Sequence, residues 1–144
     1  MTTIKLAVLD MAGTTVADDG LVLRAFAAAA APAGLAESGP EADAARQYVL
    51  DTMGQSKIVV FRALFGDEDR AQAANRAFEA EYDHLVDEGG ATAIAGAAES
   101  ISALRNAGIQ VALTTGFSRT TQDKLLAALG WQTLADLTLS PAEA

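Results

Sequence analysis

The stretch IKLAVLDMAGTT at residues 4–15 decides the fold that we expect for this chain. Its first six residues form an apolar run with one lysine, which is typical of a buried strand in a parallel sheet. The run ends at Asp10, and a loop with Gly13, Thr14 and Thr15 follows. Open α/β sheets bind ligands at the carboxyl ends of their strands, so the stretch predicts a functional carboxylate at a strand tip.

After this strand, the sequence shows two successive kinds of secondary-structure pattern. The patterns are helical throughout from Leu21 to Leu85, and after Gly96 helices alternate with short apolar strands. We expect helices at residues 21–31, 41–53, 57–65, 69–86, 97–106 and 120–129, and strands at 4–9, 109–114 and 137–139. A β-α-β alternation interrupted after its first strand predicts an α/β fold with a parallel sheet and an inserted helical cap. The expected hinges lie at residues 17–20 and 89–95.

Composition excludes several classes of function. The 144 residues include 19 Asp+Glu against 10 Lys+Arg, a net charge of −9. An acidic surface repels nucleic-acid phosphates, so we expect no nucleic-acid partner. No apolar run approaches the roughly 18 residues of a membrane helix, so we expect no membrane partner. The chain has no cysteine, which excludes thiolate chemistry and fits the cytoplasmic location that we expect.

The loop after the first strand has residues suited to a phosphoryl group. Gly13 lets the backbone come close to a phosphate, Thr14 and Thr15 offer hydroxyls, and loop amides can act as anion donors. A carboxylate at Asp10 could attack phosphorus and form an aspartyl-phosphate. The alternative is an aspartate that only caps a loop.

The string VLDMAGTTV at residues 8–16 resembles the first motif of the phosphonatase (phosphonoacetaldehyde hydrolase) branch of the haloacid dehalogenase (HAD) superfamily. The resemblance runs the whole length of the chain. It implies a Rossmann-like α/β core, with a parallel sheet that is incomplete here and an all-helical cap inserted between strands one and two. We therefore expect residues 1–17 to hold the first strand and nucleophile loop, 18–90 the cap, and 91–144 the remainder of the core.

Ala12 and Lys57 favour phosphonate chemistry within this resemblance. Most phosphatases of the superfamily have a second aspartate at the position of Ala12, where it protonates the leaving oxygen and contributes roughly 10²–10⁴ in rate. A phosphonate loses a carbon instead, and a protonated imine formed on a lysine can take up the electrons. The family has such a lysine in a cap pattern that matches MGQSK at residues 53–57.

Two features keep the role of Lys57 open. Its apolar neighbours would keep part of the amine neutral for attack, but a surface lysine near a helix start is the alternative. The family histidine three residues later is replaced by Val60. Without this histidine, the enzyme would act on a different substrate from the family, or would form the imine in a different way.

The string VALTTGFSR at residues 111–119 resembles the second motif of the superfamily. The resemblance implies that Thr115 and Gly116 hold the transferring phosphoryl group, although alone such a strand end is usually a turn. The next helix would direct its positive end toward the same pocket, with a capping box at Thr120 and Asp123. We expect Arg119 to face solvent.

The resemblance also implies Mg²⁺, bound by the Asp10 carboxylate, the Ala12 carbonyl and an acidic residue of a later motif. In the family, a further segment of roughly half the length of this chain follows. It holds that acidic motif, a basic residue and the last strands of the sheet. The printed sequence does not contain such a segment, so we expect a C-terminally truncated family member that turns over slowly, if at all. Its first strand would form an exposed apolar edge.

Three functions remain from the sequence. The first is a Mg²⁺-dependent hydrolase that acts through an aspartyl-phosphate on a small organophosphonate or organophosphate, with Asp10 attacking and Lys57 activating an aldehyde. The second is a phosphomonoesterase without imine chemistry. The third is a catalytically incomplete HAD-like binding module. Relatives often pair through the cap, so a homodimer is a further expectation.

Overall fold

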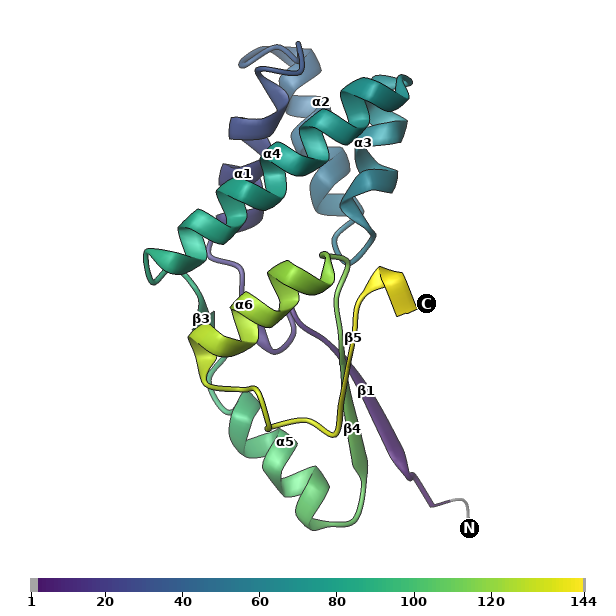
Figure 1. The fold of residues 1–144 in the computed structure, drawn as a ribbon, viewed down its shortest axis with the longest axis vertical. Helices are drawn as coiled ribbons and strands as arrows, with labels where there is room; N and C mark the ends of the chain where they lie inside the picture. The colour runs from purple at the N-terminus through teal and green to yellow at the C-terminus, as the bar shows by residue number, and fades with distance from the viewer. Residues whose placement is uncertain (1–2, 144) are drawn as a thin grey trace. The chain divides into compact units, whose positions relative to one another are not determined.

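The computed structural model describes residues 3–143, and its ribbon is drawn in Figure 1. The chain divides into two compact units. One combines Met1–Asp18 with Ala91–Ala144 and is called the sheet unit below. The other, Asp19–Gly90, is called the helical unit.

The sheet unit is built on parallel strands. Its elements are β1 (Leu6–Asp10), β2 (Val16–Ala17), β3 (Thr92–Ala93), α5 (Ala97–Asn106), β4 (Gln110–Thr114), α6 (Arg119–Leu129), β5 (Leu137–Leu139) and the 3-10 turn η1 (Pro141–Glu143). The main sheet has the order β1-β4-β5, with both pairs parallel. In register, Asp10 lies beside Thr114, and Thr114 lies beside Leu139, so all three strands end at the same side of the sheet. The predicted α/β fold class is confirmed.

Strand β1 lies at an edge of the described sheet, beside β4 (Figure 1). Leu6 and Val8 are 52% and 58% exposed, and Ile4 ahead of the strand is 68% exposed. Positions two apart lie on one face of a strand, so these side chains form one exposed apolar row. The predicted exposed edge is confirmed, whereas the prediction of a buried strand is wrong, because within residues 3–143 no element covers this face.

The short antiparallel pair of β2 and β3 was not predicted. Val16 lies beside Ala93 and Ala17 beside Thr92. Both strands lie in or next to the segments that the sequence indicated as hinges. Two residues are too few to show the alternation by which a strand is recognised in a sequence.

The helical unit contains α1 (Leu21–Ala30), α2 (Pro40–Asp51), α3 (Lys57–Phe65) and α4 (Glu68–Asp87). These bounds agree with the predicted ranges to within two residues. Helices α1 and α3 both pack on α4. Within residues 3–143, no helix is long and apolar enough to cross a membrane.

An aromatic cluster forms the core of the helical unit. The ring of Phe61 lies 5.9 Å from Phe26 and 6.0 Å from Phe78, and Phe78 lies 6.0 Å from Tyr82. Phe61, Phe78 and Tyr82 are at most 1% exposed. These rings come from three helices, so the cluster holds α1, α3 and α4 together.

Candidate functional site

Asp10 is the last residue of β1 and is half-buried. Its Oδ1 accepts the N–H of Met11 at 2.8 Å. Among the described residues, this is the one hydrogen bond made to the carboxylate, so Oδ2 is available to a metal ion or an electrophile. The structure therefore places a partly exposed carboxylate at the strand tip, where the sequence predicted it.

The loop after Asp10 is closed by its own backbone. The Met11 carbonyl accepts the N–H groups of Thr14, Thr15 and Val16 at 2.9–3.0 Å, and the Gly13 N–H donates to the Val16 carbonyl at 2.8 Å. Gly13 has a φ of +83°, in the left-handed region that favours glycine. A Cβ there would meet no atom within 4 Å, so backbone conformation, rather than lack of space, explains the glycine.

These bonds change how the loop could bind an anion. The amides of Gly13 and Thr14 are used inside the loop, whereas the loop's bonds leave out the Ala12 amide. Thr14 has an exposed side chain, and the buried Thr15 hydroxyl donates to the Asp10 carbonyl at 2.9 Å. Anion binding by Gly13 and Thr14 stays a prediction, with the Thr14 hydroxyl rather than these two amides as the available donor.

The end of β4 lies next to the tip of β1. Asp10 and Thr114 are partners in register, and neighbouring strands lie about 4.8 Å apart. Thr115 follows directly, with its N–H donating to the Leu139 carbonyl at 3.2 Å and its Oγ1 accepting the Phe117 N–H at 3.2 Å. Thr115 and Gly116 are half-buried. The structure thus brings the two sequence motifs to the same end of the sheet.

Helix α6 begins one residue earlier than predicted, and its cap is a different residue. Ser118 is the N-cap, with Oγ accepting the Thr121 N–H at 3.3 Å. The predicted capping box of Thr120 and Asp123 is therefore wrong. Ser118 is extended, with φ −63° and ψ 161°, and takes the cap position two residues ahead of Thr120.

Arg119 does not simply face solvent, as the sequence had indicated. Its guanidinium donates to Thr138 Oγ1 and to the Thr138 carbonyl, both at 2.9 Å, and to Gln122 Oε1 at 3.1 Å. Gln122 is fully buried and was not singled out from the sequence. The available signal was its place in the apolar stripe of α6, which continues with Leu125, Leu126 and Leu129.

Lys57 is the first residue of α3 and belongs to the helical unit. It is 5% exposed, and its Nζ donates to the Gln55 carbonyl at 3.2 Å. The alternative of a surface lysine is therefore wrong. Val60, which takes the place of the family histidine, is 1% exposed one turn further along the helix.

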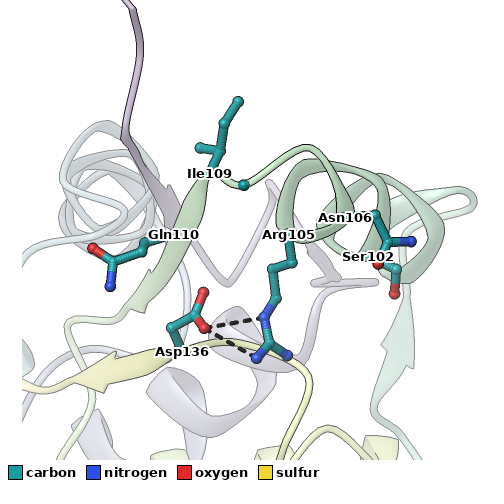
Figure 2. A pocket seen from close by; sticks show the side chains of 7 residues that line it. Ser102, Arg105, Asn106, Ile109, Gln110 and Asp136 are labelled. Atoms are coloured by element: carbon teal, nitrogen blue, oxygen red, sulfur yellow. Dashed lines mark hydrogen bonds and ion pairs between the residues drawn. The ribbon is translucent and has the colours of Figure 1, made fainter.

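A cavity of about 520 Å³ lies at the other end of the strands, where β4 begins at Gln110. Figure 2 shows Arg105 pointing to Asp136 across it. The Arg105 Nη2 lies 3.0 Å from Asp136 Oδ1, and its Nη1 donates to the carbonyls of Thr133 and Leu134. The pKa of Asp136 is lowered, first by the hydrogen bond from the Val111 N–H and then by Arg105. These groups hold α5, β4 and the segment before β5 together, so the ion pair is structural.

The residues predicted to bind metal fit Mg²⁺ in part. The Asp10 carboxylate and the Ala12 carbonyl offer hard oxygen donors of the kind that Mg²⁺ prefers. No group of three His, Cys, Asp or Glu side chains that could hold a metal ion occurs in the part of the chain that the structure describes. Asp10 and Ala12 would therefore supply two ligands of a larger set.

Three comparisons relate the chain to known proteins. Residues 4–142 match the family of haloacid dehalogenase-like hydrolases. No curated protein matches the chain. Solved structures with the same fold include a hydrolase from Pseudomonas syringae, with a TM-score of 0.81 and 15% identity over 99% of this chain and 63% of that one.

Two further structures are CbbY from Rhodobacter sphaeroides in complex with phosphate and a phosphonoacetaldehyde hydrolase-like protein from Oleispira antarctica. CbbY has a TM-score of 0.75 and 20% identity over 99% of this chain and 65% of that one. The Oleispira protein has a TM-score of 0.76 and 20% identity over 98% of this chain and 54% of that one. The chain thus spans less than two thirds of the length of all three structures. With a family match over residues 4–142 and the same fold in these structures, the chain belongs to the haloacid dehalogenase-like hydrolase family.

Proposed function

We propose that the protein is a Mg²⁺-dependent hydrolase that acts through an aspartyl-phosphate on a small organophosphonate or organophosphate, similar to the phosphonatase branch of its family. The observation that carries the proposal is the position of Asp10. It ends β1 beside the end of β4, and one carboxylate oxygen is left without a hydrogen bond from the described residues. An oxygen held in this way can attack phosphorus in line with a leaving group.

The neighbouring strand end would hold the phosphoryl group. Thr115 uses its Oγ1 to accept the Phe117 N–H, so its hydroxyl proton is available to a phosphoryl oxygen. The Gly116 and Ala12 amides would add donors, and the Thr14 hydroxyl would complete the cradle. This division of roles gives the nucleophile to the first motif and shares the anion binding between the two motifs.

Magnesium would be held by the Asp10 carboxylate and the Ala12 carbonyl, together with water and substrate oxygens. Bound there, it would offset the repulsion between a carboxylate and an anionic substrate. Asp10 remains the nucleophile in this arrangement, and the loop closed on the Met11 carbonyl fixes the Ala12 backbone.

Two residues favour a phosphonate within this class. Ala12 has no proton to give to a leaving oxygen, so a leaving carbon must be stabilised in another way. Lys57 would form an imine with an aldehyde substrate, and when the C–P bond breaks its electron pair would pass into the protonated imine. The burial of Lys57 supports this role, because a buried amine is more easily kept neutral for attack.

The second candidate is a phosphomonoesterase, in which Lys57 only binds an anionic substrate. Val60 favours it, because the family histidine is missing at that position. A related structure also favours it, since CbbY of Rhodobacter sphaeroides was solved in complex with xylulose-(1,5)bisphosphate. The cytoplasmic location and a homodimer through the cap stay predictions.

Two measurements test the proposal. Phosphate release from a panel of phosphonates and phosphate esters should fall on the order of 10⁴-fold in Asp10→Asn, since the nucleophile is lost. The matched control is Asp18→Asn, which changes the same group after the loop and should keep the rate. Full activity in Asp10→Asn would overturn the proposal.

Borohydride reduction with an aldehyde substrate separates the two candidates. Covalent trapping at Lys57, absent in Lys57→Arg, supports the imine. Phosphate-ester turnover without trapping favours the phosphomonoesterase. A protein that releases phosphate from no member of the panel would instead support the binding module.

A further inference from the structure

Gln122 lies in an unusual position for an uncharged polar side chain. It is 0% exposed, in the second turn of α6, and both ends of its amide are hydrogen-bonded. Its Oε1 accepts from Arg119 at 3.1 Å, and its Nε2 donates to the Leu139 carbonyl at 3.0 Å. A guanidinium can only donate, so the oxygen must face Arg119 and the NH₂ group must face the strands.

The NH₂ group of Gln122 contacts all three strand ends. Besides Leu139, the last residue of β5, it lies 3.5 Å from the Leu113 carbonyl in β4. It also lies 3.6 Å from the sulfur of Met11, the residue that follows Asp10. One side chain thus contacts the residue that follows β1, the penultimate residue of β4 and the last residue of β5.

The Leu139 carbonyl connects Gln122 to the second motif. It accepts both the Gln122 Nε2 and the Thr115 N–H, at 3.0 and 3.2 Å. Arg119 adds a parallel connection, because it binds Gln122 and Thr138 together. If Gln122 moved, the shared Leu139 carbonyl would move with it and shift Thr115. The contact with Met11 would shift the neighbouring Asp10 in the same way.

We propose that Gln122 is a positioning residue, which aligns the Asp10 carboxylate with the Thr115 hydroxyl and the Gly116 amide for phosphoryl binding. An apolar side chain would fill the same space without the cost of burying an amide. Unlike an apolar side chain, the buried amide makes all its hydrogen bonds in only one arrangement of the three strand ends. It therefore stabilises that arrangement over others. This inference rests on the proposed function, since it concerns the same site.

The test uses beryllofluoride with Mg²⁺, a phosphoryl mimic that binds carboxylates, observed by ¹⁹F NMR on the whole chain. Gln122→Met keeps the approximate shape and removes the amide. It should weaken beryllofluoride binding roughly tenfold or more, as loss of a residue that orients a binding group does. The matched control is Leu125→Ala, also 0% exposed on α6, which should lower the melting temperature yet leave the affinity within about twofold.

A measurement on the unsubstituted chain covers the case in which Gln122→Met does not fold. The side-chain NH₂ resonances of Gln122 should shift when beryllofluoride binds, and the backbone amide of Leu125 should not. An affinity in Gln122→Met within twofold of the original, an equal loss in Leu125→Ala, or unmoved Gln122 resonances would each overturn the inference. Binding that is absent from the unsubstituted chain, or unchanged in Asp10→Asn, would instead overturn the proposed function and the inference with it.

Discussion

The two units differ in how completely each buries its own apolar surface. In the helical unit, Phe61, Phe78 and Tyr82 are at most 1% exposed. In the sheet unit, Leu6 and Val8 are more than half exposed on an edge strand. Among the described residues, the helical unit thus buries an aromatic core, whereas the sheet unit leaves an apolar row exposed on an edge strand, which favours further association.

The largest expected effect comes from the closed core of the helical unit. Phe78→Ala should lower the free energy of unfolding by about 3–5 kcal/mol, because it removes a ring that packs edge-on against Phe61 and stacks on Tyr82. Urea denaturation followed by circular dichroism measures the loss, and NMR spectra show which unit unfolds. Leu50→Ala, at a 44% exposed position, is the control and should change stability by about 0.5 kcal/mol or less. Equal losses in both variants would contradict a closed core.

The second prediction concerns the open face of the sheet unit. The double variant Leu6→Lys with Val8→Lys should self-associate less and bind less of a hydrophobic dye, because it places charges on the exposed apolar row. Light scattering over a range of concentrations measures the association. The matched control is Leu50→Lys with Val59→Lys, two exposed apolar positions of the helical unit. If the control variant reduced self-association as much as the Leu6 and Val8 variant, the exposed apolar residues of the two units would contribute equally to association.

The third prediction tests how the sheet unit holds its own segments together. The pKa of Asp136 is lowered by the Val111 N–H and by Arg105, so ionised Asp136 contributes stability above its unfolded pKa, and this contribution is lost as the pH falls through the lower folded value. Asp136→Ala should therefore melt at a lower temperature at pH 7, with a difference that narrows toward pH 3. A difference that does not depend on pH would show that the charge of Asp136 is not involved. Asn106→Ala, at an uncharged residue that lines the same cavity as Asp136, should show no such trend.

The smallest effect is expected at the surface of the helical unit. Glu68 accepts two hydrogen bonds from Arg62, at 2.7 and 2.8 Å, and these together with Gln72 lower its pKa to about 2. Stability from this pair is present above the unfolded pKa of Glu68 and is lost as the pH falls toward 2. An NMR titration should find the low pKa, and Arg62→Gln should return it toward the ordinary value. Both side chains are about half exposed, so the effect on melting should be slight and should weaken with salt.

The sequence predicted most elements of both units, because their signals are local. The helices of residues 57–65 and 97–106 have the predicted ends, and each is closed by a glycine that the sequence shows. Asp10 was found in the same way, as the residue that ends an apolar run. Periodicity and breakers are properties of neighbouring residues, so one sequence is enough to find them.

The features that the sequence did not predict depend on distant parts of the chain. The bonds of Arg119 to Thr138 and of Gln122 to Leu139 join residues 19 and 17 positions apart, and no local pattern indicates them. The loop amides were assigned to an anion from the residue types of the loop and its place after a strand, whereas the backbone of the same loop uses those of Gly13 and Thr14. The interpretation of Lys57 as a surface lysine was excluded by its burial, which depends on packing, whereas its chemical role stays a prediction.

The pairing of β2 with β3 bears on how proteins of this fold could exchange their helical insertion during evolution. Val16–Ala17 and Thr92–Ala93 are the last and first paired residues on either side of the helical insertion, and they are hydrogen-bonded to each other. The chain therefore departs from the sheet unit and rejoins it at one place. A graft at this junction, from a short turn to an unrelated domain, would leave the strand order intact, because insertions are tolerated where their two ends are already adjacent. Exchange of this segment is thus a route by which substrate range could change while the chemistry proposed for Asp10 is inherited unaltered.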